Sequence, residues 1–246
     1  MNFMEWGKST SEVMSTARKL NLSKTLVIIS GGMDSATCLG LAKSCSKEVG
    51  CITFDYGQTH SKEIICAREV GWEYQADVKT IDLINLASNF VTALSKDSDI
   101  EIPDGATSDV PPTYVPFRNT IMLAIAAGYA QSWGYTDIFY GANIIDYSGY
   151  PDCRPEYIAK VNEVIKTHTN DIFVHAPIVY LTKADVVRLG EEVGVPWDKT
   201  WSCYRGGLNA CGKCPSCEYR LLGFGQAGIK DPIAYDEGVE TWPQKT

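Results

Sequence analysis

The stretch TLVIISGGMDSATCLGLAKSC, residues 25–45, joins an apolar run to a helix-like segment through a short turn with two glycines. The run TLVIIS (25–30) has the length and β-branched content of a buried strand, and residues 34–46 predict a helix. Glycine lets the backbone approach a ligand closely, and amide groups at a helix start can cradle an anion. The turn SGGMDS (30–35) therefore predicts a phosphate-binding loop.

This turn differs from two common nucleotide-binding motifs. It lacks the lysine of the GxxxxGK(S/T) loop, and it does not match GxGxxG. The structural alternative is a plain strand-to-helix turn, in which Asp34 or Ser35 caps the helix.

Strands and helices alternate along most of the chain. Further strands are predicted at 49–56, 74–83, 137–143 and 172–178, and helices at 60–71, 119–133, 155–168 and 182–193. Such alternation predicts βαβ units and an α/β fold with a doubly wound parallel sheet.

Ligands in such sheets bind beyond the carboxyl ends of the strands, where the strand order reverses. Polar segments follow the predicted strands at DYGQTH (55–60) and GANIIDYSGYPDCR (141–154). A longer polar insert, residues 95–119, precedes the next helix. We interpret this insert as an active-site loop, with a plain linker as the alternative.

Composition excludes some classes of protein. The 246 residues are 45% hydrophobic, enough for a full core, and the net charge of −8 disfavours a nucleic-acid-binding face. The first 24 residues contain no apolar signal-peptide region, and no stretch reaches the ~18 apolar residues of a membrane span. We therefore expect a cytoplasmic protein that acts on a small molecule, without direct contact to nucleic acid or membrane.

Four of the nine cysteines crowd one segment with the spacing C-x7-C-x2-C-x2-C: Cys203, Cys211, Cys214 and Cys217. Four thiolates at such spacing favour a closed tetrahedral Zn²⁺ site, which would be structural because no coordination position stays open. An iron–sulfur cluster, redox CxxC chemistry and coincidental burial of the four thiols are the alternatives. Buried cysteine as a small apolar filler accounts for the scattered five, including Cys153.

The turn SGGMDS resembles the pyrophosphate loop, or PP-loop, of the ATP pyrophosphatases, whose fold is adenine nucleotide alpha hydrolase-like. The wider pattern is similar to the 7-cyano-7-deazaguanine (preQ0) synthase family of queuosine biosynthesis. The segments that carry this resemblance are, in order, TFDYGQTH, PTYVPFRNTIML, GANIIDYSGYPDCRPEY, TKADVVRLG, and TWSCYRGG running into CGKCPSCEYRLLGF.

The resemblance implies an ATP-dependent, AMP-forming ligase. The family converts 7-carboxy-7-deazaguanine, ammonia and ATP to the nitrile preQ0, with zinc on the cysteine cluster and Mg²⁺ accompanying ATP. A homodimer is also implied. The ATP-binding positions expected from the resemblance are Ser30, Gly31, Gly32, Asp34, Ser35, Asp55, Tyr56 and Gln58, with Asp34 placed to engage Mg²⁺.

Four residues are predicted to act on the reacting groups: Asp34, His60, Arg118 and Lys183. His60 could be a general base, a phosphate ligand or a structural histidine. Arg118 could meet phosphate or the substrate carboxylate, or form a surface ion pair. Lys183 could reach a phosphate, or simply begin a helix that Thr182 caps.

The segment from 146 to 154 is rich in hydrogen-bonding groups that suit a purine-like face, with a decorated Gly-Pro turn as the alternative. Asn119 could join this pocket or cap its own helix. The predicted substrate-binding residues are Arg118, Asn119, Asp146, Tyr147, Ser148, Tyr150, Asp152 and Arg154.

The chain departs from the family pattern at Phe117, where many members have glycine. This leaves open a related ligase that joins the adenylated acid to another amine, even on a protein, or stops at the amide. A tRNA sulfur transferase and a non-enzymatic zinc-ribbon module are more distant alternatives.

We predict four units along the chain. They are an N-terminal extension (1–24), a PP-loop ATP-binding α/β domain (25–198), a four-cysteine zinc-binding segment (199–226) and a C-terminal tail (227–246).

Overall fold

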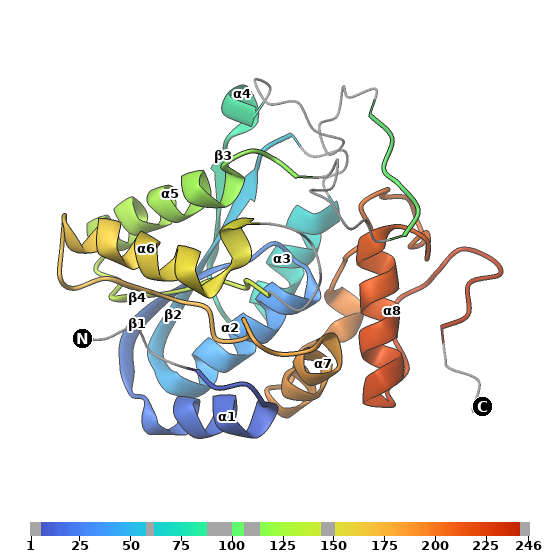
Figure 1. The fold of residues 1–246 in the computed structure, drawn as a ribbon, viewed down its shortest axis with the longest axis horizontal. Coiled ribbons are helices and arrows are strands. Elements are labelled where there is room, and N and C mark those ends of the chain that lie inside the picture. The colour runs from blue at the N-terminus through green and yellow to red at the C-terminus, as the bar shows by residue number, and fades with distance from the viewer. Residues whose placement is uncertain (1–5, 58–61, 88–99, 106–113, 144–150, 242–246) are drawn as a thin grey trace.

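The computed structural model describes residues 6–57, 62–87, 100–105, 114–143 and 151–241. Within them, the strands form one parallel sheet in the order β3-β2-β1-β4-β5 (Figure 1). The predicted α/β class with a parallel sheet is confirmed. The strands are β1 (Leu22–Ile28), β2 (Ser46–Asp55), β3 (Val78–Asp82), β4 (Asp137–Phe139) and β5 (Phe173–His175).

The strand order reverses beside β1. Val27 of β1 pairs with Cys51 of β2 on one side and with Phe139 of β4 on the other. The sheet therefore extends from β1 to β2 and β3 on one side and to β4 and β5 on the other. The switch point lies between the carboxyl ends of β1 and β4.

All five predicted helices are present, with ends within two residues of those expected. They are α2 (Met33–Cys45), α3 (Lys62–Glu73), α5 (Arg118–Trp133), α6 (Pro155–Lys166) and α7 (Lys183–Glu192). The strand predictions are less accurate at their ends: β1 begins and ends before the expected 25–30, and β4 and β5 are shorter than expected. Additional elements are α1 (Thr10–Lys19), α4 (Ile84–Ala87), α8 (Pro215–Ala227) and the 3₁₀ turns η1 (Pro151–Cys153) and η2 (Trp197–Lys199).

Two hydrophobic cores cover the two faces of the sheet, because alternate strand residues point to opposite sides. Val27 and Ile29 pack with buried residues of α1, α2, α3 and α7. Leu26 and Ile28 pack instead with α5 and α6, which lie together on the other side of the sheet (Figure 1). Helices on both faces make the sheet doubly wound, as predicted.

Helix α1 packs onto the α/β core. Val13, Met14 and Ala17 are buried in the same core as α2 and α7, and the Thr10 hydroxyl donates to the Asp185 carbonyl at 3.4 Å. Ser9 caps the helix by accepting a hydrogen bond from the Glu12 amide. The segment before β1 thus contributes apolar surface to the core, and the proposed unit boundary at residue 24 stays a prediction.

The segment from 197 to 235 packs around a buried arginine. Arg220 of α8 has no exposed surface; its guanidinium donates to both oxygens of Asp231 at 2.7 and 2.9 Å and to the Thr200 hydroxyl at 2.7 Å. Tyr235 donates to the same carboxylate at 2.7 Å, and the Trp197 carbonyl accepts a further bond from the guanidinium at 3.2 Å. This network joins α8 to the chain on both sides of it.

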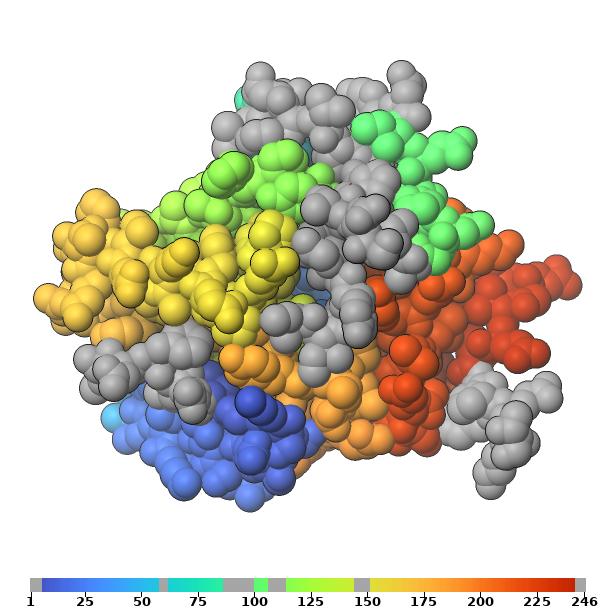
Figure 2. Space-filling view, viewed as in Figure 1, coloured from blue at the N-terminus to red at the C-terminus, as the bar shows by residue number. Residues whose placement is uncertain are grey.

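Residues 100–105, a described part of the long insert, lie against the cysteine-rich segment, as the green and orange atoms in Figure 2 show. Arg205 donates to the Asp104 carboxylate at 2.7 Å and to the Ile102 carbonyl at 2.9 Å. The Gly105 amide donates to the Lys213 carbonyl at 3.1 Å.

In the part of the chain that the structure describes, no helix is long and apolar enough to cross a membrane.

Candidate active site

The turn SGGMDS (30–35), which we call the PP-loop after the motif that it resembles, lies between the end of β1 and the first turn of α2. The Ser35 hydroxyl accepts from the Ser30 amide at 3.1 Å and donates to the Gly32 carbonyl at 3.1 Å, so it fixes the loop from inside. Gly31 has a φ of +83°, and a side chain there would collide with the backbone of α3 at Glu63 and Ala67. Glycine is therefore required at position 31.

The start of α2 suits an anion. The helix begins at Met33 with Gly32 at its N-cap, and no side chain of the described residues caps it. The alternative in which Asp34 or Ser35 serves as the cap is therefore wrong. Amide groups at an uncapped helix N-terminus, together with the positive end of the helix dipole, favour a phosphate group.

Asp34 and Lys183 meet across the carboxyl edge of the sheet. The Lys183 ammonium lies 2.8 and 2.6 Å from the two oxygens of the Asp34 carboxylate. The lysine side chain is 10% exposed and the aspartate 26%, so the pair is open to solvent on the aspartate side. Thr182 caps α7 by accepting from the Asp185 amide, as one of the two alternatives for this segment expected. The first residue of the same helix, Lys183, also contacts Asp34 of the PP-loop, so both features occur together.

The segment that follows β4 lies beside the PP-loop at the switch point. A Cβ at Gly141 would lie 3.1 Å from the Ser35 amide nitrogen, so the backbone passes directly beside the PP-loop. Asn143 is buried and donates to the carbonyls of Ile178 and Leu181 at 3.3 and 2.8 Å. These contacts hold the end of β4 and the approach to α7 in one arrangement around the PP-loop.

A second group of polar residues lies at the start of α5 and in η1. Asn119 and Asp152 are buried, and the Asn119 amide lies 3.9 Å from the Cys153 sulfur. Asn119 lies inside α5, whose N-cap is Phe117, so the alternative that Asn119 caps this helix is wrong. The guanidinium of Arg118 is 5.8 Å from the centre of the Tyr56 ring.

Asp152 is the most unusual group in this cluster. Its Oδ1 atom is buried without a hydrogen-bond partner among the described residues. Burial raises the pKa of Asp152, and the Arg118 guanidinium and hydrogen bonding by Asn119 oppose that shift. A buried polar atom left unpaired is costly, and a ligand that donates to it would remove the cost.

Cys153 lies between the two groups of residues. Burial raises the pKa of its thiol to about 11, and both Asp152 and Asp34 lie within electrostatic reach of it. The Tyr140 hydroxyl is 3.9 Å from its sulfur. A thiol with such a pKa stays protonated at neutral pH, which agrees with the expected packing role.

The remaining predicted residues are placed as follows. Asp55 ends β2 and accepts from the Gly57 amide at 3.1 Å, and Tyr56 packs against the core on the α5 side. Arg154 is exposed at the N-cap position of α6. The predicted site residues outside the described part of the chain are Gln58, His60, Asp146, Tyr147, Ser148 and Tyr150.

Sequence reasoning missed Glu63, in the first turn of α3. Burial raises the pKa of this carboxyl to about 7, and the Arg118 guanidinium opposes the shift. The available signal was its position, three residues after His60 in the polar segment that follows the second strand. A carboxyl group with a pKa near 7 beside this site can take up or release a proton near neutral pH.

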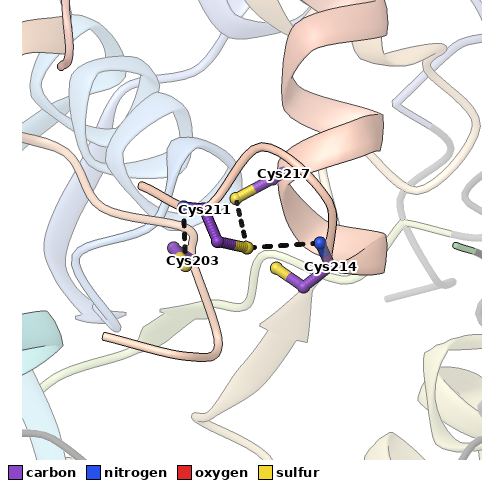
Figure 3. A group of neighbouring side chains, drawn as sticks. All are labelled: Cys203, Cys211, Cys214 and Cys217. Atoms are coloured by element: carbon purple, nitrogen blue, oxygen red, sulfur yellow. Dashed lines mark hydrogen bonds between the residues drawn. The ribbon is translucent and has the colours of Figure 1, made fainter. Parts of the chain in front are cut away.

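The four clustered cysteines converge on one point (Figure 3). Cys203, Cys211, Cys214 and Cys217 are buried, and their sulfur atoms all lie within 4.8 Å of one another. The Cys211 and Cys217 sulfurs are 3.9 Å apart, close to the roughly 3.8 Å edge of a tetrahedron with Zn–S bonds of 2.3 Å. Backbone amides of Cys211 and Cys214 point at sulfur atoms at 3.4 and 3.3 Å, as suits thiolate ligands. The donor set fits a four-coordinate metal ion.

The chain matches the family model for the queuosine biosynthesis protein QueC over residues 24–228. It belongs to the QueC family. The matched range includes the PP-loop, Lys183 and all four clustered cysteines, so the family resemblance expected from the sequence motifs is confirmed.

Relatives cover nearly the whole chain. The 7-cyano-7-deazaguanine synthase of Thermoplasma acidophilum is 48% identical over 223 residues, 87% of this chain and 92% of that protein. The enzyme of the same name from Oceanobacillus iheyensis is 43% identical over 216 residues, 86% of this chain and 98% of that protein. Among solved structures, NMN synthetase from Francisella tularensis has 15% identity and a TM-score of 0.47, over 92% of this chain and 83% of that chain.

Proposed function

We propose that this QueC family member converts 7-carboxy-7-deazaguanine and ammonia to the nitrile preQ0, with ATP cleaved to AMP and pyrophosphate. The observation that carries the proposal is the meeting of two half-sites at the switch point. One is the PP-loop with its Asp34–Lys183 pair; the other is the buried Asp152 oxygen near Arg118, which has no hydrogen-bond partner among the described residues. The relatives' shared name supplies the substrate class.

The first half-reaction activates a carboxylate, which is a poor electrophile. Its oxygen attacks the α-phosphorus of ATP, the bond to the pyrophosphate oxygen breaks, and an acyl-adenylate forms. In this proposal, the amides at the start of α2 bind the departing pyrophosphate, and Lys183 stabilises the negative charge beside them. Asp34 would engage the Mg²⁺ that accompanies ATP, which neutralises phosphate charge.

The second half makes the nitrile. Ammonia attacks the acyl carbon, AMP leaves with the bonding electrons, and a proton is lost to give the amide. The amide oxygen then attacks a second ATP at the α-phosphorus, and pyrophosphate leaves to give an adenylated amide. Loss of AMP with the C–O bonding electrons and of the two N–H protons then forms C≡N. Both activations place charge at the same phosphates, so one PP-loop serves both.

The deazaguanine base carries an N–H and an amino group on one edge. A carboxylate pairs naturally with such an edge, and we assign this role to Asp152, whose buried oxygen lacks a donor among the described residues. Arg118 is assigned to the carboxylate that reacts, because guanidinium and carboxylate groups match in geometry.

The zinc assignment has its own test. Zinc held by four thiolates would be structural and would stabilise the segment from 197 to 235. Replacing Cys214 by serine should lower bound zinc, measured by atomic emission, and reduce soluble yield. Replacing the buried Cys51 by serine controls for loss of a buried thiol far from the cluster. Full zinc in the Cys214 variant would reject the ligand assignment.

The activity test combines the purified protein, 7-carboxy-7-deazaguanine, MgATP and ammonium, with products followed by mass spectrometry. We expect the nitrile and two AMP per product. ADP in place of AMP would contradict the assigned cleavage at the α-phosphorus. An accumulating amide, or a conjugate formed without ammonium, would identify the related ligase that the sequence left open.

A further inference from the structure

The PP-loop is supported from outside by the chain segment that carries the cysteines. The Trp201 amide donates to the Gly31 carbonyl at 2.8 Å, and a Cβ at Gly32 would lie 3.6 Å from the Trp201 carbonyl oxygen. Trp201 precedes Cys203 by two residues. Gly31 is therefore hydrogen-bonded to the backbone that leads into the cysteine cluster, and that backbone also lies close beside Gly32.

Trp201 itself is firmly held. The residue is 4% exposed, and its indole N–H donates to the Cys203 carbonyl at 3.0 Å. The preceding residue, Thr200, accepts from the buried Arg220. The position of the Trp201 peptide is thus set by the cysteine segment and by α8, and the Gly31 carbonyl is fixed by that peptide.

Lys62 closes this arrangement over the ring. Its ammonium lies 3.2 Å from the centre of the Trp201 ring, and it donates to the carbonyls of Gly207 and Leu208 at 3.1 and 2.8 Å. These carbonyls belong to the loop between Cys203 and Cys211. Lys62 also begins α3, the helix whose backbone abuts Gly31. The Lys62 side chain therefore contacts both Trp201 and the loop between Cys203 and Cys211, which we call the metal-binding loop. The backbone of Lys62 belongs to α3, the helix that packs against Gly31.

We propose that Lys62 is a positioning residue, which couples the metal-binding loop to the PP-loop through Trp201 and so sets the affinity for ATP. The inference rests on the proposed ATP chemistry. The Lys62 ammonium contacts two carbonyls and the Trp201 ring, so the role of Lys62 is to hold protein groups rather than phosphate. The cysteine cluster is then part of the wall of the nucleotide site.

The test replaces Lys62 by methionine, which keeps the stem and removes the charge and the donors. We expect the dissociation constant for MgATP, measured by calorimetry, to rise about tenfold, since a cation–π contact and two hydrogen bonds that hold Trp201 and the loop are lost. The KM for ATP should follow it, with kcat changed less than about threefold. Bound zinc should stay at the wild-type level.

Two variants serve as controls. Lys62→Arg keeps a cation over the ring and N–H donors, so it should restore ATP affinity to within about threefold of wild type. Lys24→Met removes a comparable contact far from the site, where the ammonium lies 4.6 Å from the Tyr135 ring centre and 2.8 Å from Glu48. That variant should bind ATP as the wild type does.

A readout without nucleotide separates this inference from the proposed function. In amide NMR spectra of the zinc-loaded protein, Lys62→Met should shift the Gly31 and Gly32 signals, and Lys24→Met should not. Unmoved glycine signals, wild-type ATP affinity in Lys62→Met, or zinc lost in step with affinity would each overturn the positioning role. Failure of the wild type to bind MgATP, with the glycine signals shifted, would instead reject the proposed function.

Discussion

Two ion pairs in this molecule differ in burial and in what surrounds them. Arg220 and Asp231 have no exposed side-chain surface, and Thr200 and Tyr235 add further hydrogen bonds to the pair. Lys183 and Asp34 are similarly close, at 2.6 Å against 2.7 Å for Arg220 and Asp231, but the aspartate is 26% exposed at the carboxyl edge of the sheet. Removing one member of an enclosed pair leaves an uncompensated buried charge and is costly for the fold, whereas a pair with one open side can exchange a partner for a ligand.

The largest effect on stability is expected when the enclosed pair is broken. Replacing Arg220 by methionine leaves the Asp231 charge buried and should lower the free energy of unfolding by about 3–5 kcal/mol, measured by urea denaturation. Arg188→Met breaks an exposed pair, with Asp185 at 3.0 Å, and should cost less than about 1 kcal/mol. Similar costs for the two variants would remove the distinction drawn between enclosed and open pairs.

Breaking the open pair should affect chemistry more than folding. Asp34→Asn keeps the size of the side chain and removes its charge, so turnover should fall at least about 100-fold. The melting temperature should move by no more than a few degrees, and bound zinc should be unchanged. Glu192→Gln, at an exposed pair with Arg18, is the control for loss of a carboxylate. Joint loss of zinc and folding in Asp34→Asn would show that this pair is structural as well.

Glu63 is a half-buried carboxyl group that belongs to neither of these ion pairs, and it predicts how the free energy of unfolding depends on pH. Its folded-state pKa of about 7 lies above the ordinary 4.5, so the folded protein binds this proton more tightly than the unfolded chain does. The free energy of unfolding should therefore decrease as pH rises from about 4.5 to about 7. Because the side chain is only half-buried, we expect Glu63→Gln to remove about 1 kcal/mol of this decrease. Identical pH profiles of stability in the two proteins would contradict the assignment.

The smallest effect is expected at Phe117, which is 69% exposed and has a φ of +56°. A left-handed conformation is costly for a residue with a side chain, so Phe117→Gly should raise the free energy of unfolding by about 0.5 kcal/mol. Phe117→Ala keeps the backbone cost and should give no gain. A destabilised glycine variant would mean that the ring itself contributes to packing.

The comparison also shows what sequence reasoning can reach. The PP-loop and its flanking strand and helix can be predicted because their signals are local: an apolar run, two glycines and a helical pattern within residues 25–45. The cysteine spacing is equally local. The sequence leaves two alternatives for Lys183, because its 2.6 Å contact with Asp34 depends on the packing of α7 against α2.

The contacts that sequence reasoning missed are long-range. Arg220 and Asp231 are ordinary charged residues in the sequence, and only the closed arrangement of α8 with the segments on either side of it makes them a buried pair. The Trp201 amide and the Gly31 carbonyl carry no side-chain signal at all. The left-handed backbone at Phe117 is visible only in the structure.

The hydrogen bond from Trp201 to Gly31 has a consequence for synthesis on the ribosome. Gly31 is translated well before its partner Trp201, and before the Asp231 that pairs with the neighbouring Arg220. A nascent chain can form β1 and α2 early, but the turn between them lacks this support until Trp201 has left the exit tunnel. The turn therefore reaches its final backbone arrangement only after the cysteine-rich segment has begun to emerge.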